Sequence, residues 1–268
     1  MKPVITFIIP VRHPKNSKNW ENLKNNLSQT IQSISAQTNP DWRAVIIANE
    51  GADIPALPDK FECVRVDFPP NDMYENQGKD RELFFEARRL DKGSRILKGM
   101  LNRETTFFMV VDDDDFIHRD LVAFASKDRD ANGWTISDGY LWEDAGSLLY
   151  LHHDFSNTCG TSHVIKSELF KLPSNFEQSD PEYIKTMLGS HIKIEHILSS
   201  NGTPLEKLPF VGAIYRIGHV YSHSKSPGLI QYIVRKNQGR SIFRLWSDFL
   251  NLRLLSNKVK REFFGIKN

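Results

Sequence analysis

The first half of the chain alternates short apolar segments with amphipathic ones, and this alternation constrains the fold more than any other feature. The apolar segments are rich in β-branched and aromatic residues, which is typical of buried strands. They lie at 4–10, 41–51, 61–68 and 105–111. Segments 19–38 and 91–104 instead place leucine and isoleucine at steps of three and four, as in a helix with one apolar face. This order predicts an α/β fold with a mostly parallel sheet covered by helices.

Four consecutive aspartates, Asp112 to Asp115, follow the last of these strands. Carboxylates so close together raise one another's pKa and oppose folding unless positive charge lies among them. In parallel sheets ligands bind at the carboxyl ends of strands, which is where this run is expected. Helix capping explains one or two aspartates but not four. The run therefore favours a site for a divalent cation and phosphate oxygens, with capping or a solvated acidic turn as the alternative.

The second half is less regular. Strands are expected within 133–144 and 147–155, as a hairpin. Segment 163–172 is expected to be a strand that enters a short helix, 190–202 a helix that Gly202 ends, and 208–224 a strand with its exit loop. Pro227 and Gly228 mark the end of this body.

The tail, 227–268, reads as two helical stretches joined near Gly239. From Lys225 to Asn268 there are ten Lys/Arg and two Asp/Glu, a net charge of +8, so the rest of the chain carries 2 − 8 = −6. A basic amphipathic helix with Trp and Phe is typical of a segment that lies on a membrane surface, and equally of a C-terminal helix packed on the body.

Composition narrows the class of protein. With 40% hydrophobic and 25% charged residues, the 268-residue chain fits a globular protein with a sizeable core. Two cysteines, Cys63 and Cys159, provide no disulfide framework and favour a reducing compartment. The N-terminal apolar run is broken by Pro10, too short for a membrane span, and lacks a signal cleavage site. Nucleic-acid binding is disfavoured because the basic charge is confined to the tail.

Three segments, in the right order, resemble family 2 glycosyltransferases of the bacterial surface-polysaccharide type. "ITFIIPVRH" occupies the place of that family's first strand, and "SISAQTNPDWRAVIIANEG" resembles its segment from helix to second strand. "VVDDDDFIHRDLV" resembles its Asp-x-Asp motif. The resemblance implies a GT-A fold over 1–226, with a nucleotide-sugar-binding half at 1–116 and an acceptor-binding half at 117–226, outside which lies the tail.

The resemblance also implies an activity. A sugar would pass from a nucleoside-diphosphate sugar, a UDP-sugar in the first instance, to a hydroxyl of a glycan or lipid-linked acceptor. Mn²⁺ or Mg²⁺ would be the cofactor, because hard cations suit carboxylate ligands and stabilise charge on a departing diphosphate. The expected setting is surface-polysaccharide biosynthesis, with an inverting transfer in the cytoplasm or at the inner face of the cell membrane, where the tail would contact the membrane surface.

The same resemblance assigns the binding residues. Asp112 is expected near the ribose and Asp114 on the metal, with Asp113 and Asp115 as substitutes because a run of four leaves the register open. His219, and after it His223, resemble a late histidine that completes the metal site in the family. The donor is expected to contact Pro10, Val11, Arg12, Asn49, Glu50, Lys92, Arg95, Asp112 and Asp113. Where the family usually has Asp-Asp-Gly-Ser after its second strand, this chain has Asn49-Glu50-Gly51. For Lys92 and Arg95 the alternative is a solvated charge on a helix.

The catalytic base departs from the family pattern. Inverting members carry an Asp or Glu, typically in a Glu-Asp pair, at the start of a late helix, and the Asp position is held here by His191. An imidazole can deprotonate a hydroxyl at neutral pH. Asp180, Glu182 and Glu195 are the alternatives. Residues 158–162 resemble the family's acceptor-side segment.

Two other classes compete with the transferase. A nucleotidyltransferase also uses acidic metal ligands, but it typically needs a glycine-rich phosphate loop after its first strand, and "PVRHPKNSKNW" has no glycine. A degenerate domain that binds a glycan or a protein partner is the non-enzyme alternative. The missing Glu-Asp pair favours it, and the intact aspartate run disfavours it.

Overall fold

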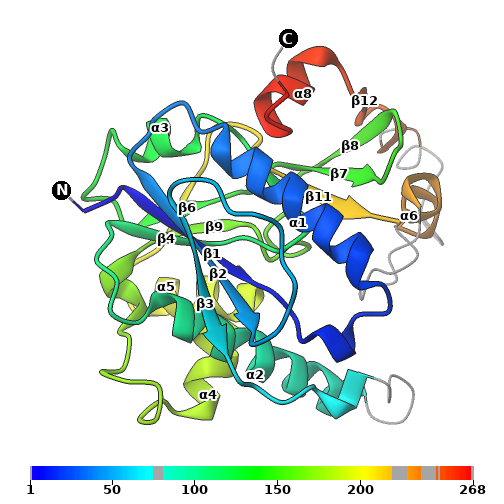
Figure 1. The fold of residues 1–268 in the computed structure, drawn as a ribbon. Coiled ribbons are helices and arrows are strands. Elements are labelled where there is room, and N and C mark those ends of the chain that lie inside the picture. The colour runs from blue at the N-terminus through cyan, green and yellow to red at the C-terminus, as the bar shows by residue number, and fades with distance from the viewer. Residues whose placement is uncertain (1, 75–80, 219–227, 237–245, 247, 267–268) are drawn as a thin grey trace.

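The computed structural model describes residues 2–74, 81–218, 228–236, 246 and 248–266 (Figure 1). Its larger sheet has seven strands in the order β10-β6-β9-β4-β1-β2-β3. They are β1 (Ile5–Pro10), β2 (Trp42–Asn49), β3 (Phe61–Val66), β4 (Phe107–Val110), β6 (Gly133–Thr135), β9 (His163–Lys166) and β10 (Glu206–Lys207). Strands β3, β2, β1 and β4 are parallel, and β9 runs antiparallel to β4 and β6. The expected α/β class with a mostly parallel sheet is confirmed.

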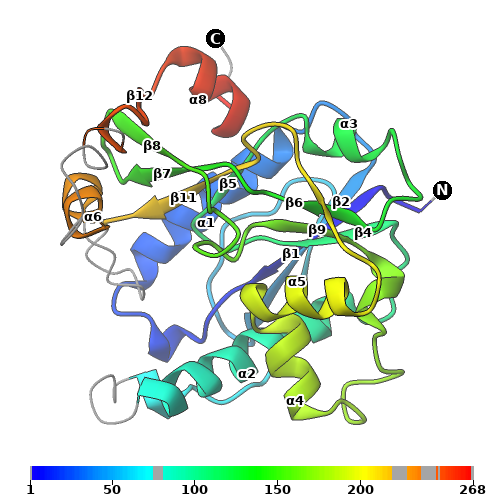
Figure 2. The same cartoon turned by 180° about the vertical axis from the view of Figure 1, so that it is seen from behind.

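Helices cover both faces of this sheet (Figure 1; Figure 2). Helix α1 (Trp20–Ser35) packs on the face that holds Phe7 and Ile9, and α2 (Arg81–Met100) packs on the face that holds Ile8. Successive side chains of a strand point to opposite faces, so an apolar strand such as β1 can be buried on both sides. Helix α2 begins ten residues before the segment expected from its apolar periodicity, and this added half carries much of the site.

A second sheet of five strands lies beside the first, in the order β12-β8-β7-β11-β5. Its strands are β5 (Phe116–Ile117), β7 (Gly139–Glu143), β8 (Leu148–His152), β11 (Ala213–Ile217) and β12 (Leu252–Leu254). Strands β7 and β8 form the expected antiparallel hairpin. The chain does not enter a helix directly after the aspartates: β5 comes first, because it pairs with β11, and the short α3 (Leu121–Ala125) follows.

Several short helical segments join the longer elements, and the last of them lead into α5 (His191–Ser200). They are η1 (Pro14–Asn16), η2 (Asp72–Tyr74), η3 (Ser167–Phe170), α4 (Pro181–Tyr183) and the π-helical η4 (Ile184–Leu188). Two glycines let this region approach α2 closely: a Cβ on Gly93 would lie 2.5 Å from the Ile184 oxygen, and one on Gly189 would lie 2.1 Å from the Arg89 oxygen. The segment directly before α5 is thereby held against α2.

The tail contains α6 (Leu229–Lys236) and α8 (Asn257–Phe263), as well as strand β12 between them. The prediction of a second helical stretch is therefore wrong at residues 252–254. These residues form β12, which pairs with the free edge of β8 and extends the smaller sheet. Phe263 is 1% exposed, and the Phe264 ring lies 4.3 Å from the Phe116 ring. This part of the tail packs on the body.

No helix in the described part of the chain is both long enough and apolar enough to cross a membrane.

Candidate active site

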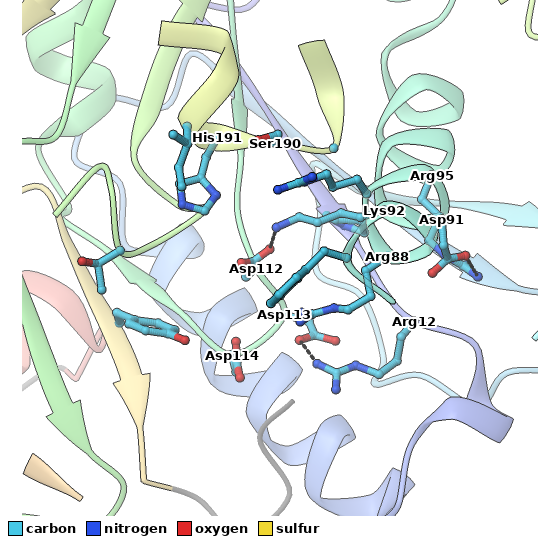
Figure 3. A pocket seen from close by; sticks show the side chains of 18 of the residues that line it. Arg12, Arg88, Asp91, Lys92, Arg95, Asp112, Asp113, Asp114, Ser190 and His191 are labelled. Atoms are coloured by element: carbon cyan, nitrogen blue, oxygen red, sulfur yellow. Dashed lines mark hydrogen bonds and ion pairs between the residues drawn. The ribbon is translucent and has the colours of Figure 1, made fainter. Parts of the chain in front are cut away.

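A cavity of about 330 Å³ opens at the carboxyl ends of β1 and β4 (Figure 3). Six parts of the chain line it: the end of β1 with the residues after it, one face of α2, the loop after β4, the loop before β9, the start of α5, and strand β11. Its ionisable lining residues are Arg12, Arg88, Arg89, Asp91, Lys92, Arg95, Asp112, Asp113, Asp114, His191 and Arg216. The position is the one at which parallel α/β sheets bind ligands.

The structure separates the four aspartates into two groups. Asp112, Asp113 and Asp114 line the cavity, whereas Asp115 is fully buried and turned away from it. Asp115 accepts hydrogen bonds from Thr161 Oγ1 at 2.6 Å and Cys159 Sγ at 3.2 Å. Burial, followed by repulsion from Asp114 and Asp112, raises the pKa of Asp115 well above its usual range. Asp115 thus has a structural position, and the aspartates that face the cavity are Asp112 to Asp114.

Two side chains fix the backbone of this loop. Thr161 Oγ1 accepts a hydrogen bond of 2.9 Å from the Asp112 amide while it donates to Asp115. Arg216 Nε donates to the Asp114 carbonyl oxygen at 3.2 Å. The buried Arg216 guanidinium lies over the rings of Phe116 and Trp142, whose centroids are 5.0 and 5.2 Å away.

Cations from two directions face the aspartates. Lys92 Nζ of α2 lies 2.5 Å from Asp112 Oδ1, and Arg12, which follows β1, lies 3.4 Å from Asp113 Oδ1. Burial opposes the charged form of Lys92, but attraction by Asp112 outweighs it and the pKa of the ammonium is raised. Gly160 makes room for the Lys92–Asp112 pair, because a Cβ there would lie 2.8 Å from Nζ and 2.9 Å from Asp112 Oδ2.

Arg88 differs from the other cations of the cavity. Each of the other five has a carboxylate within ion-pair distance: Arg12–Asp113, Arg89–Glu86, Lys92–Asp112, Arg95–Asp91 and Arg216–Asp144. Arg88 instead lies over the ring of Phe84, and no carboxylate of the described chain forms an ion pair with it. A cavity cation that lacks a carboxylate partner is well suited to an anionic ligand.

The residues expected to contact the donor differ in how they lie relative to the cavity. Arg95 is 1% exposed and its guanidinium binds Asp91 at 3.0 Å and Asn49 Oδ1 at 2.8 Å, so its hydrogen bonds serve the protein interior. Asn49 also donates to the Phe68 oxygen, and neither Asn49 nor the exposed Glu50 lines the cavity. Pro10 lines the cavity, whereas Val11 is fully buried.

The carboxylates suit a divalent cation. Asp113 Oδ2 is buried without a hydrogen-bond partner, and burial raises the pKa of Asp113 to about 6 despite Arg12. A divalent cation held by Asp112–Asp114 would give this oxygen a partner and would meet the oxygen ligands that Mg²⁺ and Mn²⁺ prefer. In the described chain no three acidic, histidine or cysteine side chains are already gathered as a metal site. His219 and His223 lie outside the described residues.

Of the four candidate bases, His191 is the one that lines the cavity. It is the first residue of α5, which Ser190 caps, and its Nε2 is buried without a hydrogen-bond partner. Burial and the nearby Lys92 lower the pKa of His191 to about 4, so the imidazole is neutral. Its position at the N-terminus of a helix acts in the same direction.

The three alternative bases are engaged elsewhere. Asp180 caps α4 by accepting from the Glu182 amide at 3.0 Å, and Glu182 itself pairs with Lys185 at 2.7 Å. Glu195 lies 3.2 Å from His163 Nε2. Of the acceptor-side segment 158–162, Thr158 and Gly160 line the cavity.

The sequence reasoning missed Arg88 and Arg216. Arg88, Lys92 and Arg95 are spaced i, i+4, i+7, which places them on one face of a helix. That signal was available, but the helix was expected to begin only at residue 91. No comparable signal marks Arg216, because its partners come from distant parts of the chain.

Comparison with solved structures finds similar folds. The chain is similar to residues 1–349 of S. aureus TarS in complex with UDP, with 11% identity and a TM-score of 0.46, over 81% of this chain and 61% of that one. The same fragment in complex with UDP-GlcNAc is 10% identical, with a TM-score of 0.43, over 97% of this chain and 69% of that one. Rv0371C of Mycobacterium tuberculosis H37Rv in complex with manganese is 12% identical, with a TM-score of 0.35, over 81% of this chain and 90% of that one.

The chain therefore spans about three fifths of the TarS fragment in the UDP complex. No protein-family model matches the sequence, and comparison with curated proteins finds no relative. With identities near one tenth and TM-scores below 0.5, the function has to be argued from the residues of the cavity.

Proposed function

We propose that the protein is a glycosyltransferase that takes its sugar from a nucleoside-diphosphate sugar and uses a divalent cation. One observation carries this proposal: three carboxylates of a strand-end loop share a cavity with Lys92, Arg12 and Arg88, the last of which forms no ion pair with a carboxylate of the described residues. Carboxylates alone would suit a metal, and cations alone would suit an anion. Their combination suits a diphosphate bound together with a metal ion.

Asp114, together with Asp112 and Asp113, would hold Mn²⁺ or Mg²⁺. The metal, when bound, supplies positive charge that stabilises the diphosphate as it departs from the sugar. Lys92 and Arg88 reach the same space from α2 and would bind phosphate oxygens by charge-assisted hydrogen bonds. In this proposal the Lys92 ammonium leaves Asp112 and binds a phosphate oxygen when the donor and the metal bind.

His191 is our candidate for the base that accepts the proton of the acceptor hydroxyl. In the ligand-free protein its pKa of about 4 makes it a weak base. A bound diphosphate would place negative charge beside it and draw Lys92 away, and both changes raise the pKa of the imidazole. Exposed Phe85 and Ile192 give the mouth of the cavity an apolar rim, which suits the face of a sugar ring.

A direct attack assisted by one base would invert the anomeric centre, and we propose an inverting transfer to a glycan or lipid-linked acceptor in surface-polysaccharide biosynthesis. A nucleoside-diphosphate sugar is a cytoplasmic metabolite, so the enzyme would act in the cytoplasm or at the inner face of the cell membrane. The nucleotidyltransferase alternative would typically need a glycine-rich phosphate loop after the first strand, and residues 10–20 contain no glycine.

The test is calorimetric titration of the full chain with UDP, GDP and CDP, each with and without Mn²⁺. The proposal expects one nucleotide to bind in a metal-dependent way. Asp114→Ala should abolish the metal dependence, and Asp130→Ala, an exposed aspartate outside the cavity, should leave it unchanged. If all three nucleotides fail to bind, or if Asp114→Ala binds UDP and Mn²⁺ like the parent, the metal-dependent transferase is wrong.

A further inference from the structure

The tail carries a group of exposed apolar side chains, here named the tail patch. It consists of Ile230, Val234, Trp246, Phe249, Leu250 and Leu254, which are 36% to 76% exposed. Eleven large apolar side chains are exposed in the described part of the chain, and six of them belong to this one stretch. Such a concentration marks an interaction surface, whereas single exposed apolar residues scattered over a protein need no explanation.

An ion pair brings the two segments of the patch together. Lys236 Nζ lies 3.1 Å from Asp248 Oδ1, which also accepts a 2.6 Å hydrogen bond from Tyr150 of β8. The pair joins the end of α6, which carries Ile230 and Val234, to the segment that carries Trp246, Phe249 and Leu250. Both views of the fold place α6 and β12 on the same side of the molecule, next to β7 and β8 (Figure 1; Figure 2).

The exposed residues of α6 are not needed for its packing. Leu229 and Ile233 are buried against the body, whereas Ile230 and Val234, each one position further along, are exposed. The helix therefore has one apolar face that stabilises the fold and a second that meets solvent. A binding partner would explain why the second face is apolar although it is exposed.

The charge of this region selects the kind of partner. From Leu229 to Leu255 the sequence has five Lys/Arg and one acidic residue, Asp248. The Asp248 side chain is only 13% exposed and is already paired, whereas Arg235 and Arg253 are exposed. A second copy of the chain would bring like charges together, and an anionic surface would be complementary.

We propose that the tail patch docks on an anionic lipid surface. Trp246, Leu250 and Leu254 would enter the boundary between head groups and acyl chains, where Trp is typically enriched. Arg235 and Arg253 would contact lipid phosphates, since long basic side chains can extend from an apolar surface to charged groups. This inference stands independently of sugar transfer, because no residue of the patch lines the cavity.

The test is sedimentation of the full chain with phosphatidylcholine vesicles, with and without phosphatidylglycerol. We expect binding that needs phosphatidylglycerol and weakens as salt is added. The double variant Leu250→Glu, Leu254→Glu should bind at least about tenfold more weakly. Leu83→Glu is the matched control, the same exchange at a residue of α2 that is 57% exposed, and should bind like the parent.

Point variants are required because deletion of the tail would also remove β12 and the buried Phe263 from the body. Both changed leucines are more than 70% exposed, so the double variant should keep the parent's thermal stability. Lack of vesicle binding by the parent, or equal binding by the double variant, would overturn the proposal. It would also be overturned if light scattering showed a dimer that the double variant abolishes, because the patch would then bind a second copy.

Discussion

Arg216 Nε donates a hydrogen bond to the Asp114 carbonyl oxygen, 102 positions away in the sequence, at 3.2 Å. The remaining guanidinium donors bind Asn26 Oδ1 at 2.7 Å, Gln29 Oε1 at 2.6 Å and Asp144 Oδ1 at 3.1 Å. One side chain therefore joins the aspartate loop to α1 and to the end of β7. A planar fork of donors can do this, whereas the ammonium of lysine cannot.

We predict that Arg216→Lys impairs the aspartate loop more than it impairs the fold. The charge is retained, but several charge-assisted hydrogen bonds are lost, and we expect the free energy of unfolding to fall by about 2–4 kcal/mol. Metal-dependent UDP binding should weaken at least about tenfold in protein that remains folded. Calorimetry beside a thermal melt measures both effects, and a folded variant with parental UDP binding would contradict the positioning role.

Arg88 and Arg89 form a matched pair for the phosphate assignment. Both line the cavity from α2, but Arg89 is 2.6 Å from Glu86, which Lys185 also binds, whereas Arg88 has no carboxylate partner in the described chain. Loss of a charge-assisted hydrogen bond costs about 1.5–3 kcal/mol. Arg88→Gln should therefore weaken UDP binding about ten- to a hundredfold, and Arg89→Gln much less. Equal effects in a titration would show that Arg88 has no special role.

Gly160→Ala should disturb the Lys92–Asp112 pair without a large effect on the fold. The added Cβ would lie under 3 Å from both Lys92 Nζ and Asp112 Oδ2, so one of these side chains has to move. We expect about tenfold weaker metal-dependent UDP binding and a loss of about 1–2 kcal/mol in unfolding free energy. Parental affinity for UDP would mean that the pair has room to rearrange.

His152 should make stability fall in acid. Burial and Lys236 lower the pKa of His152 from 6.5 to about 4, and its Nε2 lies 2.7 Å from Tyr232 Oη. The unfolded chain therefore binds a proton that the folded chain excludes, and the free energy of unfolding decreases as pH falls from 6.5 to 4. The loss attributable to His152 should approach about 3 kcal/mol.

Denaturant unfolding at several pH values measures this dependence. His152→Gln removes the titrating group while retaining an amide that can bond to Tyr232, so its unfolding free energy should change less with pH over that window. A pH dependence equal to the parent's would assign the effect to other groups, of which His191 is the first candidate because its pKa is lowered to about 4 as well.

The sequence by itself determined the α/β class and the place of the site. Both faces of β1 are apolar, so it has to be buried between helices, and a parallel sheet puts the residues after β1 and β4 at one edge. This geometry brings Arg12 and Asp113 together across 101 positions. Local patterns suffice for this prediction because the apolar residues that make both faces of the strand are consecutive in the sequence.

Only the tertiary structure decided which aspartates face the cavity. Four identical neighbours look alike in sequence, and Asp115 differs because Thr161 and Cys159, more than 40 positions away, bind its carboxylate. The tertiary structure also decided that Arg95 binds Asn49 and Asp91 in the interior. It likewise decided that β12 is a strand, because this segment pairs with the edge of β8. These outcomes depend on partners distant in sequence, and local periodicity carries no information about them.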